Sequence, residues 1–309
     1  MMTDSDKPGN QEGQAFCVAV DWGTSSFRLW VLAANGAVIG ESRGLEGMAI
    51  AAASPGGFPD VLARHLAAAK APADAHILIA GMAGARQGWR EAPYITTPAL
   101  LADVAAGAIA VDYEGRDVRI LPGVAQTSNG AEDVMRGEET QLLGAGMQDG
   151  MVCIPGTHSK WVSLQDSTVT HFNTFMTGEL FAVLGTHSIL QHGVTPGAQI
   201  APDGPAFLEA VREMQADGAA LTAKLFSVRA RGLVGDADGA SGAARLSGLL
   251  IGAEIAAARP DGPVTLLASD GASELYAAAL AAAGIQTKTL DAEMASQAGL
   301  LRAAHMIWS

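Results

Sequence analysis

The most informative stretch of this sequence reads Asp21-Trp22-Gly23-Thr24-Ser25-Ser26-Phe27-Arg28-Leu29-Trp30. It follows the apolar run at residues 16–20, which predicts a short buried strand that ends at the Asp21 carboxylate. Gly23 begins a tight turn, and the residues after it return as a second strand. Backbone N–H groups of such a turn can form a concavity for an anion, and hydroxyl side chains add donors. The candidate anion-binding residues of this turn are Gly23, Thr24, Ser25 and Ser26.

Two charged side chains flank the turn. Asp21 could hold Mg²⁺, through water, because this ion retains several of its waters in proteins. Arg28 lies two residues beyond Ser26 on the same strand face, from which it could reach a phosphate or a carboxylate. The alternative is an ordinary hairpin with a capped turn.

The first third of the chain has the pattern of an α/β unit that begins with an antiparallel meander. The Asn35-Gly36 pair is a strong hairpin signal between the second and third strands. The expected elements are strands at 16–20, 26–32 and 38–43, a helix at 58–71, a strand at 76–82, an alanine-rich helix at 98–110 and a strand at 118–121.

The rest of the chain predicts a second α/β unit. Thr177 is the expected N-cap of its second helix. The elements in chain order are a helix from 133 to about 147, strands at 151–154, 161–164 and 169–175, helices at 179–190, 205–225 and 241–258, a strand at 264–268, and helices at 273–283 and 293–305.

A second glycine turn follows the strand at 151–154. It reads Gly156-Thr157-His158-Ser159-Lys160, and it repeats the chemistry of the first turn with Pro155 in place of the acid. His158 and Lys160 could contact an anion, or they could be solvated side chains of a surface turn. Both turns have Gly-Thr-x-Ser followed by a basic residue and a tryptophan, so either the chain contains a duplication or two turns resemble each other by chance.

Three further segments carry candidate residues. Glu138 and Glu139 start a helical run, where acids favour the helix dipole, but one of them could also accept a proton from a hydroxyl. The glycine-rich loop after the strand at 76–82 could bring its backbone close to a ligand, or it could be a flexible surface loop. The turn before the helix at 273–283 could seat a nucleotide, or it could be a simple crossover. The candidates in these two loops are Gly84, Arg86, Trp89 and Arg90, and then Ser269, Asp270, Gly271 and Ala272.

The composition limits the classes of function. The chain has 309 residues, 19 Lys and Arg against 32 Asp and Glu, a formal net charge of −13 and 37 glycines. This balance excludes general nucleic-acid binding, but a small anion could still be bound by backbone N–H groups, a metal ion and a few basic side chains. The two cysteines, Cys17 and Cys153, lie in apolar runs and are expected to be core residues. Residues 1–14 are expected to form a flexible tail, no stretch predicts a membrane span, and the chain is expected to be cytoplasmic.

Taken together, six segments resemble the 2-dehydro-3-deoxygalactonokinase family of the actin/hexokinase/Hsp70-like superfamily. They are DWGTSSFRLW (21–30), GMAGARQGWREAPY (81–94), DVMRGEETQLLGA (133–145), PGTHSKWV (155–162), FMTGELFAVLGTHSIL (175–190) and LSGLLIGAEIA (246–256). The resemblance implies a two-lobed, actin-like (ribonuclease H-like) α/β fold, in which each lobe is a mixed sheet flanked by helices. It implies lobes at 15–120 and 121–292, a final helix at 293–309 that packs back on the first lobe, and an active site in the cleft between the lobes.

The resemblance also implies the reaction and the roles of residues. ATP would phosphorylate the C6 hydroxyl of 2-dehydro-3-deoxy-D-galactonate, with Mg²⁺ on Asp21. The turns at 23–26 and 156–160 would bind phosphate, and residues 269–273 would lie on the adenosine side. Glu138 is the first choice as base, with Glu139 and Asp21 as rivals. Arg28, Arg86 or Arg90, or the amides of the Gly81 loop, would bind the substrate carboxylate. The acidic balance of the chain also predicts that Arg28, Arg86, Arg90 and Lys160 face the cleft. Two departures from the family pattern are the missing aspartate before Gly156 and the presence of Ala85 where a serine is more usual.

Other functions are compatible with parts of this pattern. The chain could be a kinase for another sugar or sugar acid, or a phosphatase-like relative. It could also be an ATP-driven conformational switch without a small-molecule substrate, although 309 residues leave little room for a partner-binding domain. A sensor without activity is a third alternative, and the retained Asp21, glycine turns and acidic pair argue against it.

Overall fold

The computed structural model describes residues 14–128 and 130–308, except for the side chain of Asp270. The chain divides into two compact units. Among the described residues, unit 1 contains 14–125, 134–146 and 294–308, and unit 2 contains 126–128, 130–133 and 147–293. The tail expected at residues 1–14 lies outside the described residues, apart from Gln14. The helices that the structure describes include none that is long and apolar enough to cross a membrane.

Unit 1 is built on a six-stranded mixed sheet with the order β3-β2-β1-β4-β8-β7. The first three strands form the expected antiparallel meander, and β1 also pairs in parallel with β4. The strands of this sheet are β1 (Ala15–Trp22), β2 (Phe27–Ala33), β3 (Val38–Gly44), β4 (His76–Gly81), β7 (Ile109–Tyr113) and β8 (Arg116–Ile120).

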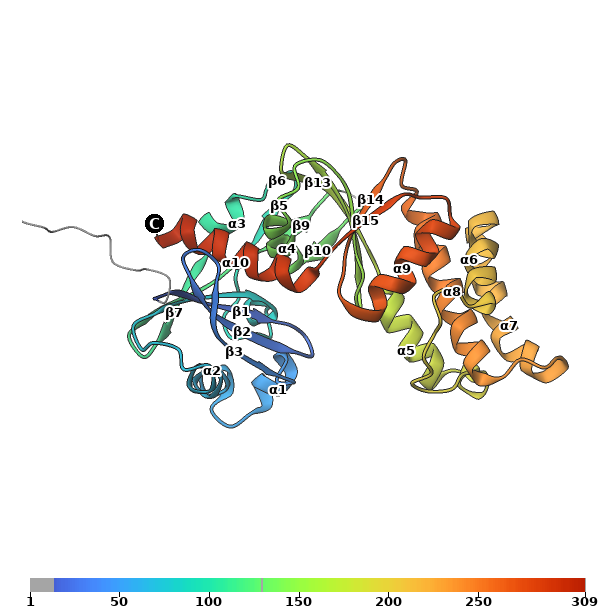
Figure 1. Ribbon diagram of the computed structural model, residues 1–309, viewed down its shortest axis with the longest axis horizontal. Helices are drawn as coiled ribbons and strands as arrows, with labels where there is room; N and C mark the ends of the chain where they lie inside the picture. Colours follow the sequence, from blue (N-terminus) through green and yellow to red (C-terminus); the bar gives the residue numbers. More distant parts are fainter. Residues whose placement is uncertain (1–13, 129, 309) are drawn as a thin grey trace, which may run out of the picture. The chain divides into compact units, whose positions relative to one another are not determined.

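Helices cover both faces of this sheet (Figure 1). On one face, α2 (Gly57–Ala68) buries Val61 and Leu62 against Val18, Val20 and other alternate residues of the strands. On the other face lies α10 (Ala292–Trp308), the last helix of the chain. The remaining elements at least partly within this unit are α1 (Met48–Ala53), η1 (Met82–Gly84), β5 (Tyr94–Thr96), β6 (Ala99–Leu100), α3 (Asp103–Ala106), β9 (Gly123–Gln126), β10 (Asp133–Met135) and α4 (Glu138–Ala145).

The extent of unit 1 differs from the lobe boundary expected at residue 120. Strand β9 pairs in parallel with β5, which keeps residues up to 125 in this unit. Helix α4 crosses α10 at backbone contact, because a Cβ atom on Gly144 would lie 1.9 Å from the carbonyl oxygen of Ala295. A Cβ atom on Gly299 would lie equally close, 1.9 Å, to the carbonyl oxygen of Thr140. The helix that carries Glu138 and Glu139 therefore belongs to unit 1.

Unit 2 has a sheet in which β11 (Gly150–Ile154), β12 (Ser159–Gln165) and β13 (Thr168–Phe175) form an antiparallel meander. On its other side, β11 pairs in parallel with β14 (Val264–Leu267), which pairs with β15 (Thr287–Leu290). The order β13-β12-β11-β14-β15 matches the order β3-β2-β1-β4-β8 of unit 1. The two glycine turns thus occupy the same place in two copies of one topology, which favours duplication over chance.

The helices of unit 2 pack through glycines. Gly248 and Gly252 lie on α8 (Gly239–Ala258), and a Cβ atom on Gly248 would lie 2.3 Å from the carbonyl oxygen of Phe207 in α6 (Pro205–Ala216). The helical layer with α6, α7 and α8 is seen in Figure 1. The other elements are α5 (Thr177–His187), η2 (Ile189–Gly193), η3 (Gly218–Ala220), α7 (Leu221–Val234) and α9 (Asp270–Ala282). Both cysteines are buried free thiols, as predicted.

The predicted helix over residues 98–110 is wrong. Only a four-residue helix, α3, forms there, and residues 109–113 are strand β7. β7 pairs with β8 through a two-residue turn at Glu114 and Gly115, whose φ angles of 51° and 73° are those of a type I′ hairpin. Cross-strand pairing therefore overrides the helix propensity of the alanines.

Two other predicted helices are interrupted. The segment from residue 133 begins as strand β10, and the helix starts only after Gly137, whose φ of 107° suits glycine alone. The predicted helix at 205–225 is divided at Asp217, whose φ of −153° and ψ of 84° are not helical. Gly218 follows directly and begins the short helix η3, so a poor helix former lies at the break.

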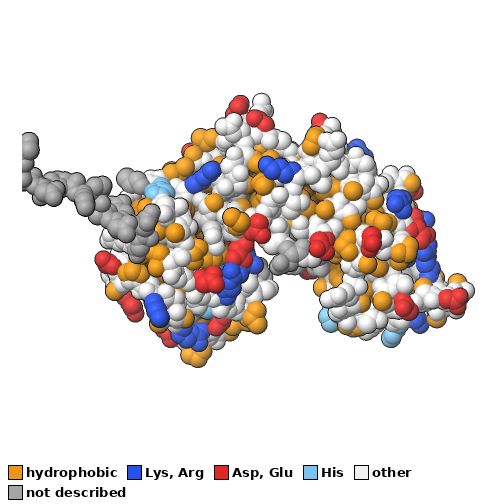
Figure 2. All heavy atoms as spheres, in the orientation of Figure 1, with side chains coloured by type: hydrophobic (Ala, Val, Ile, Leu, Met, Phe, Trp, Pro, Cys, Tyr) orange, Lys and Arg blue, Asp and Glu red, His pale blue; other side chains and the backbone are white. Residues whose placement is uncertain are grey.

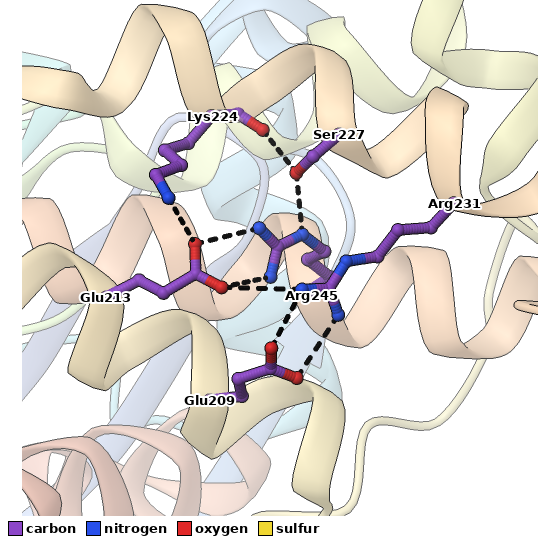
Figure 3. Close-up of polar contacts among 6 residues, drawn as sticks. All are labelled: Glu209, Glu213, Lys224, Ser227, Arg231 and Arg245. Atoms are coloured by element: carbon purple, nitrogen blue, oxygen red, sulfur yellow. Dashed lines mark hydrogen bonds and ion pairs between the residues drawn. The ribbon is translucent and has the colours of Figure 1, made fainter. Parts of the chain in front are cut away.

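A charged network joins α6, α7 and α8 (Figure 3). Arg245 is 3% exposed and donates two hydrogen bonds to the Glu213 carboxylate, at 3.0 and 2.9 Å. Lys224 lies 3.3 Å from the same carboxylate, and Arg231 pairs with both Glu213 and Glu209. Hydrogen bonding by Arg245 holds the pKa of Glu213 at about 2. The network thus fixes three helices through one carboxylate.

We expect Glu213→Gln to lower the free energy of unfolding by about 2–4 kcal/mol at pH 7, because buried Arg245 would lose its counter-charge. A depressed pKa stabilises the fold above the unfolded value of 4.5, and this stabilisation is lost as the pH falls toward 2. The difference between wild type and variant should therefore shrink in acid. Urea unfolding at several pH values measures it. Glu209→Gln, on the exposed end of the network, should cost less than about 1 kcal/mol, and equal costs would contradict the assignment.

Candidate functional site

The first glycine turn connects β1 to β2. The N–H of Gly23 donates to the carbonyl of Ser26 at 2.9 Å, so this amide closes the turn instead of facing a ligand. Thr24 and Ser25 are exposed and Ser26 is half-buried. Gly47 supports the turn from behind, since a Cβ atom there would lie 2.2 Å from the carbonyl oxygen of Thr24. No sequence motif marks Gly47, because its role depends on this close approach between distant segments.

Asp21 and Arg28 are direct cross-strand neighbours at the end of β1. Arg28 Nη1 lies 3.6 Å from Asp21 Oδ2, and the hydroxyl of Ser296 donates to the same oxygen at 3.4 Å. Gln141 Nε2 donates to Ser296 Oγ at 3.3 Å, which connects α4 through α10 to Asp21. Ser296 lies 275 positions from Asp21 in the chain, and no sequence motif marks it.

Gly81 brings the acidic pair next to the first turn. It ends β4 opposite Trp22 with a φ of +89°, and a Cβ atom on it would lie 2.6 Å from the carbonyl oxygen of Trp22. Gly137 approaches from the other side, where a Cβ atom on it would lie 3.5 Å from Gly81 Cα. Residues 21, 81 and 137, far apart in sequence, therefore form one region of unit 1.

The two acids differ in environment. Glu139 is 0% exposed, and both of its oxygens accept from the N–H of Gly137 at 2.8 Å. Burial, together with the nearby Glu138 carboxylate, raises the pKa of Glu139 to about 8. Glu138 is half-buried and accepts from the N–H of Arg136 at 2.9 Å. Glu138 is thus the more accessible carboxylate, and Glu139 is enclosed.

The loop after Gly81 is held by Arg136, another residue that no sequence motif marks. Arg136 donates to the carbonyl of Ala92 at 2.8 Å and lies over the ring of Tyr94 at 4.3 Å. Gly84 is buried beside it, because a Cβ atom there would lie 2.8 Å from Arg136 Nη1.

The other predicted residues of this loop point elsewhere. The side chain of Arg86 is 82% exposed and pairs with Glu91 at 4.0 Å, and Arg90 is also exposed. Trp89 packs in an aromatic cluster, with ring centroids 6.5 Å from Trp22 and 5.6 Å from Tyr113. Its ring is therefore committed largely to the core of unit 1.

The second glycine turn connects β11 to β12 in unit 2. Gly156, Thr157 and His158 are exposed, and His158 Nε2 pairs with a carboxylate oxygen of Glu179. Lys160 is only 5% exposed, and its Nζ donates to the carbonyl of His158 at 3.2 Å. Gly178 supports this turn from behind, because a Cβ atom there would lie 2.5 Å from the carbonyl oxygen of Gly156.

A buried carboxylate lies behind this turn. Glu254 of α8 is 2% exposed and accepts from Trp161 Nε1 at 2.8 Å, from Tyr276 Oη at 2.7 Å and from the Thr177 hydroxyl. Thr177 is therefore not the N-cap that the sequence predicted: Met176 holds that position, and the Thr177 hydroxyl is used by Glu254. Burial raises the pKa of Glu254, and its hydrogen-bond donors oppose that shift.

A pocket of about 300 Å³ opens beside the same turn. Its wall is mostly apolar and comes from the second turn and from helices α5, α8 and α9. The lining residues are Pro155, Gly156, Thr177, Gly178, Phe181, Ile200, Ser247, Leu250, Ile251, Ala272, Leu275 and Tyr276.

The predicted turn at residues 269–272 reaches this pocket through Ala272. Ser269 Oγ donates instead to Asp291 Oδ2 at 3.4 Å. Gly271 is exposed, and the side chain of Asp270 lies outside the described residues. Within residues 14–128 and 130–308, no group of three or more His, Cys, Asp or Glu side chains is placed to hold a metal ion.

Comparison with known proteins agrees with these features. The model of the 2-keto-3-deoxy-galactonokinase family matches residues 21–303. This chain belongs to that family. It is 50% identical over 302 residues to DgoK1 of Rhizobium meliloti (strain 1021), which is assigned as a 2-dehydro-3-deoxygalactonokinase, and the match covers 95% of this chain and 98% of the relative. It is 32% identical over 298 residues to the 2-dehydro-3-deoxygalactonokinase of Escherichia coli (strain K12), covering 94% and 98%.

Solved structures agree with the family. A crystal structure from Sinorhizobium meliloti, also assigned as a 2-dehydro-3-deoxygalactonokinase, superposes with a TM-score of 0.91 at 50% identity and covers 95% of this chain and 97% of that one. Component A of (R)-2-hydroxyglutaryl-CoA dehydratase from Acidaminococcus fermentans has a TM-score of 0.51 at 13% identity, covers 96% and 100%, and shows the fold alone. The predicted family and the predicted two-lobed, actin-like α/β fold class are confirmed.

The raised pKa of Glu139 predicts a pH-dependent stability difference. A native pKa of about 8 against an ordinary value of 4.5 means that the folded state keeps a proton that the unfolded state releases, so this residue costs stability as the pH rises between these values. Glu139→Gln removes that cost. The free energy of unfolding of the variant relative to wild type should rise with pH, by up to about 1.4 kcal/mol per pH unit between about pH 5 and 8.

Urea unfolding at three pH values in this range measures the difference. Glu41→Gln, on exposed strand β3, serves as the control and should differ from wild type by a constant amount. A constant difference for Glu139→Gln as well would contradict the assigned pKa.

Proposed function

We propose that this chain transfers the γ-phosphoryl group of ATP to the C6 hydroxyl of 2-dehydro-3-deoxy-D-galactonate, giving the 6-phosphate. The observation that carries the proposal is the family match over residues 21–303, together with the full-length relatives that have this activity in their names. ATP is an intracellular substrate and both cysteines are free thiols, so we place the reaction in the cytoplasm.

Unit 2 is the proposed nucleotide-binding unit. The largely apolar pocket beside Gly156 is large enough to hold an aromatic base, and pockets that bind small molecules are typically lined in this way. The turn at residues 156–160 borders this pocket and would bind phosphate through the exposed backbone of residues 156–158 and the Thr157 hydroxyl, whereas the Ser159 hydroxyl is buried. Lys160 adds one positive charge beneath the turn.

Unit 1 is proposed to contribute the metal ligand and the acceptor side of the reaction. Asp21 is a single carboxylate, 19% exposed at its side chain, and a carboxylate together with substrate phosphates is the usual ligand set of Mg²⁺. Mg²⁺ would neutralise charge on the β- and γ-phosphates when bound. Ser296 and Arg28 fix the orientation of Asp21, and the exposed turn at Thr24 and Ser25 offers donors beside it.

Glu138 is the proposed general base for the C6 hydroxyl. It is the accessible member of the acidic pair, whereas the enclosed Glu139 has a pKa of about 8 and keeps its proton through much of the neutral range. For the substrate carboxylate, Arg28 is the preferred contact among the three arginines considered. Arg28 is half-buried beside Asp21, whereas Arg86 and Arg90 extend into solvent.

The substrate is tested by ADP release with a panel of 2-keto-3-deoxy sugar acids, aldoses and no acceptor. We expect turnover with 2-dehydro-3-deoxy-D-galactonate well above that with each aldose, and little ADP release from ATP alone, because kinases exclude water from the transferred phosphoryl group. Turnover only with an aldose would displace the proposed substrate, and equal turnover without an acceptor would favour an ATP-driven switch.

Glu138→Gln should lower kcat by about 10²–10⁴-fold, the usual contribution of a general base. The dissociation constant for ATP should change little, because the amide keeps the size of the side chain. Steady-state kinetics and calorimetry measure the two quantities. Glu41→Gln should retain wild-type turnover, and retained turnover in Glu138→Gln would remove Glu138 from the mechanism.

A further inference from the structure

We infer that Glu254 is the positioning residue of the nucleotide pocket: it fixes the pocket wall through Thr177 and Tyr276 without touching the ligand. The inference rests on the proposed function of unit 2. Glu254 has no part in the proposed chemistry. Its buried carboxylate accepts hydrogen bonds from three separate elements.

The Glu254 carboxylate is buried among hydrogen-bond donors from neighbouring elements. Glu254 projects from α8, and its partners come from β12, α5 and α9: Trp161 donates to Oε1, whereas Thr177 and Tyr276 both donate to Oε2. The hydroxyl of Ser159 lies 2.8 Å from Tyr276 Oη. Because the single phenolic proton of Tyr276 is directed to Glu254, the proton between these two hydroxyls must come from Ser159. The hydrogen bonds therefore all run toward the carboxylate.

Both oxygens of residue 254 act as acceptors in this arrangement. A glutamine could keep its amide oxygen toward the indole N–H, and its NH₂ group would then donate to the two hydroxyls, which would have to reverse from donor to acceptor. An apolar side chain would instead leave all three donors without their acceptor. The three partners are neutral, so they stabilise the carboxylate only through these hydrogen bonds. An apolar core residue would avoid the cost of burying a charge. The Glu254 carboxylate therefore serves to fix the positions of its three partners and not to maximise stability.

Glu254 acts on the pocket through two of its lining residues. Thr177 and Tyr276 are part of the wall, but Glu254 is not. Thr177 is followed by Gly178, which lies against the carbonyl of Gly156 at the second glycine turn. Fixing Thr177 therefore fixes both the wall of the pocket and the support of the phosphate-binding turn. Loss of the carboxylate should loosen both while leaving unit 1 intact.

The test measures the dissociation constant for Mg·ADP by calorimetry, and KM for ATP and for the sugar acid, in the full chain. Glu254→Leu should raise the ADP dissociation constant by about tenfold or more, because the three buried donors lose their acceptor, while KM for the sugar acid stays within about twofold. Thr177→Val should also weaken ADP binding. Thr177→Ser restores the donor and should bind ADP at least about fivefold more tightly than Thr177→Val.

The control for lost stability is Glu213→Gln, which removes another networked carboxylate of unit 2 on a helix that does not line the pocket. It should lower the melting temperature and leave the ADP dissociation constant within about twofold of wild type. If Glu254→Leu fails to fold, the comparison of Thr177→Val with Thr177→Ser still tests the inference.

The outcomes separate the inference from the proposed function. A wild-type protein that binds ADP, with Thr177 and Glu254 variants that bind it equally well at a lowered melting temperature, would overturn the positioning role alone. Equal increases in KM for both substrates would also overturn it. A wild-type protein that binds neither ADP nor ATP would overturn the proposed function and this inference together.

Discussion

Backbone-to-backbone contact behind each glycine turn is the constraint on which the candidate site depends. Gly47 lies against the turn at Thr24, Gly81 against Trp22, and Gly178 against Gly156, each at a distance that admits no Cβ atom. Glycine permits such close backbone approach because it has no Cβ atom. The second layer of backbone gives each turn its shape. The 37 glycines of this acidic chain are thus partly explained by the need for such supports.

The distribution of charged side chains is a second feature of the structure. The face shown in Figure 2 has basic side chains interspersed among acidic ones. At the candidate site, Asp21 is oriented by one arginine and one serine, and Lys160 is buried under its own turn. The side-chain carboxyl groups of Glu139 and Glu254 are almost completely enclosed, and they accept hydrogen bonds from backbone or neutral side-chain donors. The acidic balance is therefore compatible with the proposed anion binding by these turns, because Asp21 is paired and Glu139 and Glu254 are buried.

Sequence patterns predicted the features that depend on interactions between residues close together in the chain. The meander at the start of each unit, the two glycine turns and the acidic pair at Glu138 were all recognisable, because strand alternation and turn chemistry act over a few residues. The alanine-rich segment before β7 was misread, since the cross-strand pairing that overrides its propensity lies in residues that come later. Ser296, Arg136 and Gly47 were missed because their importance comes from contacts with distant residues. Arg86, Arg90 and Trp89 were chosen for their chemistry, but the direction of a loop side chain depends on packing that spacing does not encode.

The crossing of α4 and α10 through Gly144 and Gly299 has a consequence for how the protein is made. Unit 1 contains the first strand of the chain and also the last helix, so its sheet leaves the ribosome long before the helix that covers one face of it. Unit 2 has all of its residues available by position 293. During synthesis, the unit that starts first is therefore completed second, and Asp21 obtains its Ser296 partner only when the final helix emerges. Until the final helix emerges, it cannot cover its face of the unit 1 sheet.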